Sequence, residues 1–406
     1  MKYYTYTNII SKLSVWTRSH RRIVAACGII CVVFAIACFA RFAIKTHHAK
    51  HRPPRSILTI YWDKGRYTGE TVNKIPDGNG CLTKDGSTYT GYWEHGEMKY
   101  GTITTAKLTY EGSLRANKFD GYGTAKYKNG RAYWGYWAND YKEGLGLQRD
   151  STGQLEFGYF KEGILQHVET SDFSVGDRVY GIDVSRHQGN ISWQDLFLSC
   201  NEKGGVNGKM PANPKHMQPV LFAMVKSTQG TNLRDRRYGS NSRNARRCGK
   251  MFGAYHFLTM DAPGKKQAQF FIDNTELLKG DFPPLLDLEK NTAKKRTVSD
   301  KEFAAIIPIA KEWIAEIKAH YGVNPIIYTN MHVYRTFVAT DPELRKYDLW
   351  LAAPGRKRPD VARCILWQFS HSGRANGIKE NAVDLNLFKG DLKDLEKYIR
   401  EKGIQR

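Results

Sequence analysis

The chain has 406 residues, which is too long for one ordinary domain and excludes a peptide or mini-protein. Its 62 Lys and Arg against 40 Asp and Glu give a formal net charge of +22, which by itself would suggest a polyanion as partner. Ten of the basic residues and no acidic residue fall within residues 1–56, so much of the excess flanks a single apolar segment.

That apolar segment follows a basic tail of residues 1–22 and reads IVAACGIICVVFAIACFA over residues 23–40. About 20 such residues span the hydrocarbon layer of a bilayer, so we expect an uncleaved transmembrane signal anchor over residues 23–44 and a polar linker over 45–60. A cleaved signal peptide and a lipidated Cys38 are the alternatives. Five Lys or Arg lie on each side of the segment, so the charge distribution does not orient it.

Residues 61–165 repeat with a period of 21–23 residues. Each unit places an aromatic residue shortly before a glycine, and Asp-Gly or Asn-Gly turns separate aromatic-rich alternating runs. Such turns are typical of β-hairpins, so we expect an all-β stack of hairpins whose aromatic side chains mostly form its own core. The recurring glycines are Gly69, Gly91, Gly112, Gly135 and Gly158.

The segments Tyr89-Thr-Gly-Tyr-Trp93 and Tyr133-Trp-Gly-Tyr-Trp137 resemble the MORN repeat. We expect the repeats to act as a spacer that positions the rest of the chain and takes no part in bond cleavage. The resemblance implies a surface for protein or lipid contact, which is the minority alternative.

From residue 175 to 406 short apolar runs alternate with helical patterns at about 235–249, 264–279 and 299–320. This alternation predicts an α/β fold, an irregular (β/α) TIM-like barrel whose site lies at the carboxyl ends of its strands. Pro308 is expected to kink the third helix or to mark a boundary in it. The strands are expected at 180–184, 220–226, 251–257, 284–288, 325–329, 349–353 and 364–369.

Acidic residues follow several of these strands. Asp183 closes the first, Asp287 and Glu289 close the fourth, and Asp384 lies near the end of the domain. Residues i and i+2 of a strand point to the same side, so Asp287 and Glu289 are expected to project together into the barrel mouth. Two close carboxyl groups have separated pKa values, which is the arrangement that glycoside hydrolysis needs.

The same region resembles a glycoside hydrolase family 25 lysozyme of the Chalaropsis type. The matching segments occur in order across nearly the whole domain: Tyr180-Gly-Ile-Asp-Val-Ser-Arg-His-Gln-Gly189, Phe222-Ala-Met-Val-Lys226, Gly253-Ala-Tyr-His-Phe257, Asp287-Leu-Glu289, Ile327-Tyr-Thr329, Leu349-Trp-Leu-Ala352, Leu366-Trp-Gln368 and Val383-Asp-Leu-Asn386.

The resemblance implies a muramidase that cleaves the β-1,4 bond between N-acetylmuramic acid and N-acetylglucosamine in peptidoglycan, with no metal or cofactor. By matching motif, Glu289 is the proton donor, Asp287 stabilises the reacting centre, and Asp183 and Asp384 are further acidic residues of the pocket. Candidates for sugar contact, each with core packing as the rival role, are Tyr255, Tyr328, Trp350 and Trp367.

The chain departs from the family pattern after the second strand, where it has Lys226-Ser-Thr-Gln-Gly230 and the family usually has Glu at the position of Gln229. This substitution supports the alternative of a catalytically inactive peptidoglycan-binding receptor on the same fold. A nucleic-acid or lipid-binding scaffold would explain the charge but leaves the acidic strand ends unexplained, so no nucleic-acid partner is expected. Gln229 is included among the substrate-binding candidates.

The expected substrate also decides the expected location, a single-pass protein of the inner membrane with its barrel in the periplasm or outside the cell. The seven Cys show no metal-binding spacing, and Cys200 with Cys248 is one candidate disulfide. Residues 201–218, rich in Gly, Pro and Lys, are expected to form a long surface loop.

Overall fold

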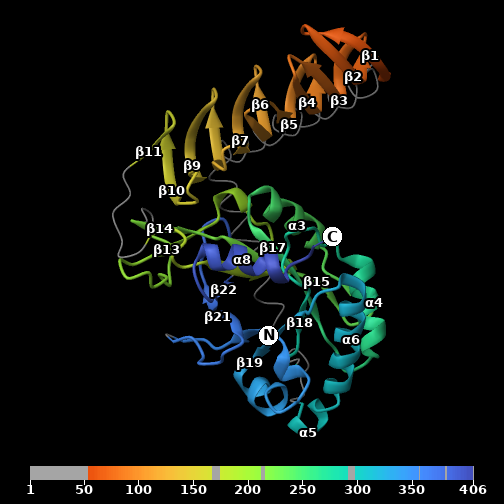
Figure 1. The fold of residues 1–406 in the computed structure, drawn as a ribbon, viewed down its shortest axis with the longest axis vertical. Coiled ribbons are helices and arrows are strands. Elements are labelled where there is room, and N and C mark those ends of the chain that lie inside the picture. Colours follow the sequence, from red (N-terminus) through yellow and green to blue (C-terminus); the bar gives the residue numbers. More distant parts are fainter. Residues whose placement is uncertain are drawn as a thin grey trace, which may run out of the picture.

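The structure is a computed structural model that describes residues 54–166, 174–211, 215–290, 298–355, 357–379 and 382–405. It contains a long antiparallel sheet, here called the array, and a closed barrel with surrounding helices (Figure 1). The apolar segment 23–40 lies outside the described residues. Among those residues, no helix is long and apolar enough to cross a membrane.

The array has eleven strands in strict sequence order, each paired antiparallel with the next, as the hairpin pattern predicts. Its strands are β1 (Ser56–Trp62), β2 (Gly65–Val72), β3 (Ile75–Lys84), β4 (Ser87–Glu94), β5 (Glu97–Thr104), β6 (Leu108–Arg115), β7 (Lys118–Tyr127), β8 (Ala132–Ala138), β9 (Tyr141–Arg149), β10 (Leu155–Lys161) and β11 (Ile164–Leu165).

Paired glycines explain the repeat. Gly112 of β6 lies opposite Gly123 of β7, and the ring of Tyr110 covers this bare stretch of backbone. The Tyr110 hydroxyl donates a hydrogen bond of 2.8 Å to the carbonyl of Ser113, which leaves no polar atom of this buried ring unsatisfied. Trp137 of the following hairpin packs edge-on against the Tyr110 ring, with ring centroids 5.8 Å apart. Each repeat therefore supplies core for its neighbour.

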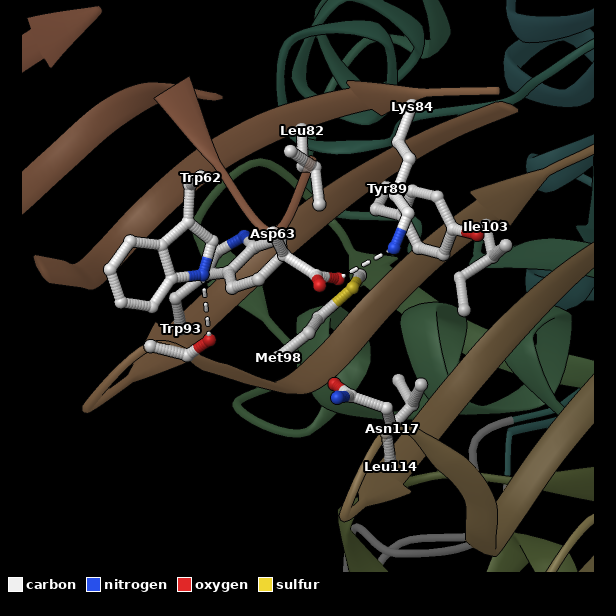
Figure 2. Close-up of a pocket in the computed structure, with 11 residues that line it drawn as sticks. Trp62, Asp63, Leu82, Lys84, Tyr89, Trp93, Met98, Ile103, Leu114 and Asn117 are labelled. Atoms are coloured by element: carbon white, nitrogen blue, oxygen red, sulfur yellow. Dashed lines mark hydrogen bonds and ion pairs between the residues drawn. The ribbon is translucent and has the colours of Figure 1, made fainter. Parts of the chain in front are cut away.

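The first hairpins leave a groove of about 670 Å³ on this aromatic face. Figure 2 shows Trp62 and Tyr89 at the groove, with an ion pair of 2.9 Å between Lys84 and Asp63. The indole N–H of Trp62 donates a hydrogen bond of 3.2 Å to the carbonyl of Gly96. This bond ties the end of β1 to the turn between β4 and β5.

The barrel closes through eight strands, because β12 pairs with β15 on one side and β22 on the other. Seven strands are parallel and β22 runs antiparallel to both neighbours. In ring order the strands are β12 (Tyr180–Val184), β15 (Phe222–Gln229), β17 (Met251–Phe257), β18 (Leu285–Asp287), β19 (Ile326–Asn330), β20 (Leu349–Ala352), β21 (Cys364–Gly373) and β22 (Val383–Phe388). The short β16 (Leu233–Arg234) pairs antiparallel with the end of β15.

Helices cover the outside of this barrel. The apolar side chains on the inner faces of the helices and the outward residues of the strands form one large buried cluster. This cluster includes Ala310, Trp313 and Ile317 of α6. The α-helices are α3 (Tyr238–Arg247), α4 (Gly264–Asn274), α5 (Asp300–Phe303), α6 (Ile306–Tyr321), α7 (Met331–Val333) and α8 (Leu392–Lys402); shorter helical turns are η1 (Arg186–Gln188), η2 (Trp193–Asp195), η3 (Tyr334–Val338) and η4 (Leu344–Lys346).

The structure changes several details of the expected elements, among them the end of the expected linker 45–60, where residues 56–60 belong to β1. Pro308 marks a boundary: one helix ends at Phe303, and Pro308 is the third residue of the next, where its missing N–H costs no hydrogen bond. The expected loop 201–218 is wrong at its end, because His216–Pro219 forms β14 and pairs with β13 (Phe197–Cys200). The candidate disulfide is also wrong, since Cys200 and Cys248 are both buried free thiols.

The array packs tightly on one end of the barrel. Leu145, Leu147, Leu155 and Phe157 of β9 and β10 share a buried cluster with barrel residues that lie at or before the amino ends of their strands, among them Val179, Met217 and Leu221. A chain begun near Ser174 would expose these residues. The array is therefore a structural partner of the barrel and more than a detachable spacer.

Polar contacts support the same interface. The Tyr136 hydroxyl donates to the carboxylate of Asp195 at 2.9 Å, and Arg149 binds Glu396 with both guanidinium nitrogens at 2.8 and 3.1 Å. A bidentate arginine–carboxylate pair fixes direction as well as distance. The interface therefore fixes the orientation of the array on the barrel.

The glycine pairs give a direct test of the array. A Cβ added at Gly123 would lie 2.3 Å from the Tyr110 hydroxyl oxygen, so we expect Gly123→Ala to lower the free energy of unfolding by about 1–3 kcal/mol, as overpacking does. Urea unfolding followed by tryptophan fluorescence measures this. Gly208→Ala is the control, because its Cβ meets nothing within 4 Å. Equal midpoints for the two variants would contradict the packing argument.

Candidate active site

Four predicted carboxyl groups meet at one end of the barrel, where the parallel strands end and the antiparallel β22 begins. Asp183 lies on β12 directly opposite Asp384 on β22, Asp287 is the last residue of β18, and Glu289 follows two residues later. Asp183 and Asp287 are 7 % and 6 % exposed. The alternation of the strands turns all four toward the barrel interior, as the sequence pattern predicts.

Two amide side chains hold Asp183 in place. Its Oδ2 accepts hydrogen bonds of 2.8 Å from the Nε2 of Gln368 and the Nδ2 of Asn386. The other oxygens of these amides are also used: Gln368 accepts from the Tyr328 hydroxyl at 2.9 Å, and Asn386 accepts from the Trp350 indole at 2.7 Å. One buried network therefore connects β12, β19, β20, β21 and β22.

Sequence reasoning left Gln368 and Asn386 out of the site. Both lie in motifs that were singled out, and Asn386 is two residues from Asp384 on the same strand, so it shares its face. Gln368 pairs with Asn386 across the ladder. The alternation of the strands was the signal that could have found them.

Burial raises the pKa of these carboxyl groups. For Glu289, burial and then the nearby Asp183 raise the pKa to about 7. Burial raises the pKa of Asp384 to about 9, and its carboxyl hydrogen-bonds that of Asp183. Burial and the neighbouring Glu289 raise the pKa of Asp287 well above its ordinary value. Such a site holds protons at pH values where exposed carboxyl groups have lost them.

The Oδ1 of Asp287 is buried and has no hydrogen-bond partner among the described residues. A buried unpaired carboxyl oxygen is costly, and such atoms occur where a ligand or reacting group supplies the missing partner. Asp287 is therefore the one of the four carboxyl groups with a buried oxygen that no described residue satisfies.

Lys226 of β15 is a site residue that sequence reasoning named only as part of a motif. Its Nζ donates to the Oε1 of Gln229 at 2.8 Å and lies 4.8 Å from the centroid of the Phe257 ring. Burial lowers the pKa of Lys226, and the charge of Asp287 opposes that effect. Gln229 thus acts as a neutral acceptor for an inward-facing ammonium group.

The aromatic candidates divide into two groups. Tyr328 and Trp350 are 8 % and 2 % exposed, with ring centroids 4.4 Å apart, so they form the inner wall. Tyr255 packs edge-on against Trp350 at 6.2 Å and stays partly exposed, which leaves it accessible to a ligand. Trp367 instead packs in the cluster outside the barrel, with its indole N–H donating to the Ala353 carbonyl at 2.7 Å.

A hollow of about 300 Å³ borders Glu289 and Gln229 and is lined mainly by apolar side chains, including Phe257, Met260 and Phe303. It places the carboxyl of Glu289 at the edge of a space that a ligand can enter. Within the parts of the chain that the structure describes, no three His, Cys, Asp or Glu side chains are arranged to hold a metal ion.

The chain is similar in sequence to several known proteins. The family model Glycosyl hydrolases family 25 matches residues 182–378. YegX, an uncharacterized protein of Escherichia coli, is 30% identical over 223 residues, which cover 54% of this chain and 73% of that protein. Lysozyme M1 of Streptomyces globisporus is 29% identical over 225 residues, covering 52% and 68%. The crystal structure of a lysozyme from Streptomyces coelicolor is 28% identical, covers 57% of this chain and 99% of that chain, and has a TM-score of 0.44.

The raised pKa of Glu289 predicts a pH dependence of folding. Its ordinary value is 4.5 and its folded value is about 7, so between these values the folded chain holds a proton that the unfolded chain has lost. The free energy of unfolding should therefore fall as pH rises through this window. The Glu289→Gln variant has no ionisable group at this position. Its free energy of unfolding should therefore fall less over the same window, by on the order of 2–3 kcal/mol, since one pKa unit corresponds to about 1.4 kcal/mol.

Urea unfolding at pH 4.5 and pH 7.5 measures this difference. Glu401→Gln removes an exposed carboxyl on α8 and is the matched control. Identical pH dependence in the wild type and Glu289→Gln would show that Glu289 has no raised pKa.

Proposed function

Because the chain belongs to Glycosyl hydrolases family 25 and is a glycoside hydrolase of the lysozyme type, we propose that its barrel cleaves peptidoglycan at the β-1,4 bond between N-acetylmuramic acid and N-acetylglucosamine. The observation that carries this proposal is the pair of carboxyl groups at the end of β18. Glu289 keeps its proton up to a pH of about 7, and Asp287 lies beside it with one buried oxygen that has no partner among the described residues.

In this proposal Glu289 is the general acid. A carboxyl group with a pKa near 7 is largely protonated in mildly acidic and neutral solution, so it can give its proton to the oxygen of the leaving sugar. The hollow beside Glu289 gives that oxygen a place within reach. After the proton has moved, the leaving sugar departs as a neutral alcohol.

Asp287 stabilises the positive charge that develops at the reacting sugar carbon. Burial and Glu289 raise the pKa of Asp287, and the cationic centre that develops on the sugar lowers it. The bond-breaking step favours ionised Asp287 because the attraction to this adjacent cation outweighs the repulsion from the carboxylate left on Glu289. We propose retention of configuration, by Asp287 itself or by the substrate acetamido group stabilised by Asp287.

Asp183 and Asp384 hold the substrate and the network around it. The two amides fix Asp183, and the proton of Asp384 satisfies a further acceptor of Asp183. Tyr255, the partly exposed ring of the aromatic group, is proposed to contact the sugar. Tyr328 and Trp350 contribute by positioning the amides.

The remaining parts of the chain are proposed to deliver this barrel to its substrate. The apolar segment 23–44 would anchor the chain in the inner membrane, with the barrel in the periplasm or outside the cell, because peptidoglycan lies there. The MORN-like array would hold the barrel away from the membrane and offer a surface for protein or lipid contact. Both proposals rest on the sequence pattern and on the nature of the substrate.

The proposed roles predict the effects of two substitutions. Glu289→Gln keeps the shape of the side chain and removes the transferable proton, so the rate should fall on the order of 10²–10⁴-fold. Asp287→Asn removes the charge that faces the cationic centre and should be comparably damaging. Release of reducing ends from purified peptidoglycan measures both. Glu401→Gln changes an exposed residue of α8 and should retain full activity. Activity of Glu289→Gln within threefold of wild type would refute the assignment.

Gln229 is the observation that favours the alternative, a catalytically inactive peptidoglycan-binding receptor. In the structure it accepts from Lys226, and a carboxylate there would pair with the same ammonium group. Gln229→Glu adds a negative charge near the carboxyl cluster, so we expect retained or increased activity with the alkaline limb of the pH profile shifted upward. No reducing-end release by the wild type, with release restored in Gln229→Glu, would establish the receptor instead.

A further inference from the structure

A cleft between the array and the barrel has no part in the proposed reaction. It encloses about 370 Å³ and is bounded on the array side by β6, β7 and β8 through Thr109, Thr124 and Trp134. On the barrel side it is bounded by the residues around the end of α3 and the start of β17. A second hollow of about 470 Å³ shares four of its lining residues, which are Glu111, Arg246, Arg247 and Leu278.

The walls of this cleft are strongly basic. Six cationic and three acidic side chains line the two hollows together. Most of the cations come from the segment around α3, which reads LRDRRYGSNSRNARRCGK over residues 233–250 and contains one acidic residue. The cations are Lys126, Arg243, Arg246, Arg247, Lys250 and Lys279, and the acids are Glu111, Glu276 and Asp281.

Two of the arginines already have partners within the protein. Arg246 forms an ion pair with Asp281 at 2.5 Å and hydrogen-bonds the Glu276 carbonyl at 3.0 Å. The guanidinium of Arg247 stacks 4.2 Å from the centroid of the Tyr100 ring, which joins α3 to β5. The Arg247 contact joins the two walls of the cleft, and the Arg246 contacts order the barrel wall itself.

The other four cations have no such role. The side chains of Lys126, Arg243, Lys250 and Lys279 make no hydrogen bond or ion pair with any residue that the structure describes. Lys250 is the most informative of them, because it is partly buried at the interface and burial lowers its pKa to about 8. A desolvated ammonium without a counter-ion is costly, and a bound anion would remove that cost.

We propose that this cleft is a binding site for a phosphate-bearing ligand. A phosphate group carries a charge of about −1.5 to −2 and several strong acceptor oxygens, so it can satisfy several of these cations at once. A single carboxylate would balance only one. The ligand is slender, a small phosphate ester or a single phosphodiester chain, because the cleft of about 370 Å³ lies between two facing walls and a flat bilayer surface cannot enter it.

Isothermal titration of the full chain at low salt tests the site, with inorganic pyrophosphate and a short oligothymidylate as probes. Lys126→Met combined with Lys250→Met should weaken the binding of the preferred probe at least about tenfold. Lys346→Met combined with Lys397→Met removes two exposed lysines that line neither hollow and should change the binding less than about twofold. Glu289→Gln should bind as the wild type does, which separates this site from the proposed catalysis.

The two probes distinguish the sources of the phosphate. Preference for pyrophosphate supports a small phosphate ester, and preference for the oligonucleotide supports a phosphodiester chain. The proposal is overturned by three results: no binding of either probe, equal weakening in the control variant, or tighter binding of phosphatidylglycerol vesicles that is lost in Lys126→Met with Lys250→Met.

Discussion

Closure of the barrel at β12 is the constraint on which the site depends. Because β12 pairs with β15 and with the antiparallel β22, residues from opposite ends of the domain sequence meet at one point, and Asp183 faces Asp384. The amides of Gln368 and Asn386 then saturate Asp183, and their remaining oxygens fix Tyr328 and Trp350. Without this closure the same side chains would leave several polar atoms buried and unpaired.

Burial of the carboxyl groups keeps them protonated and lowers the stability of the folded chain at neutral pH. Four carboxyl groups lie close together with one inward lysine, and burial disfavours the charged forms of all five. The cluster therefore retains protons, which is unfavourable for folding at neutral pH and useful for acid chemistry. Gln229 affects the charge of this cluster. Because it accepts the Lys226 hydrogen bond as a neutral amide, it does not neutralise the ammonium group, whose positive charge acts on the carboxyl groups.

Much of the fold could be predicted from the sequence, because glycine and aromatic spacing report the hairpins and buried apolar runs report the parallel strands. The roles of the acidic strand ends remain predictions, although the structure brings all four together. Trp367 was harder to place, since its motif suggested a sugar contact while the inward Gln368 beside it turns the indole outward. The strand that carries Asp384 was missed, because its inward residues Asp384 and Asn386 are polar.

The docking of the array could not be read from the pattern alone. Leu145, Leu147 and Phe157 read as ordinary strand residues, and only the folded chain shows that the second face of β9 and β10 is also covered. Side-chain periodicity identifies an apolar face and does not identify what covers it. The docked array has a mechanical consequence: eleven strands spaced about 4.8 Å apart make a lever about 50 Å long. Since the array packs against the strand ends opposite the carboxyl cluster, any pull on residue 54 is transmitted to the end of the barrel that lies away from the mouth.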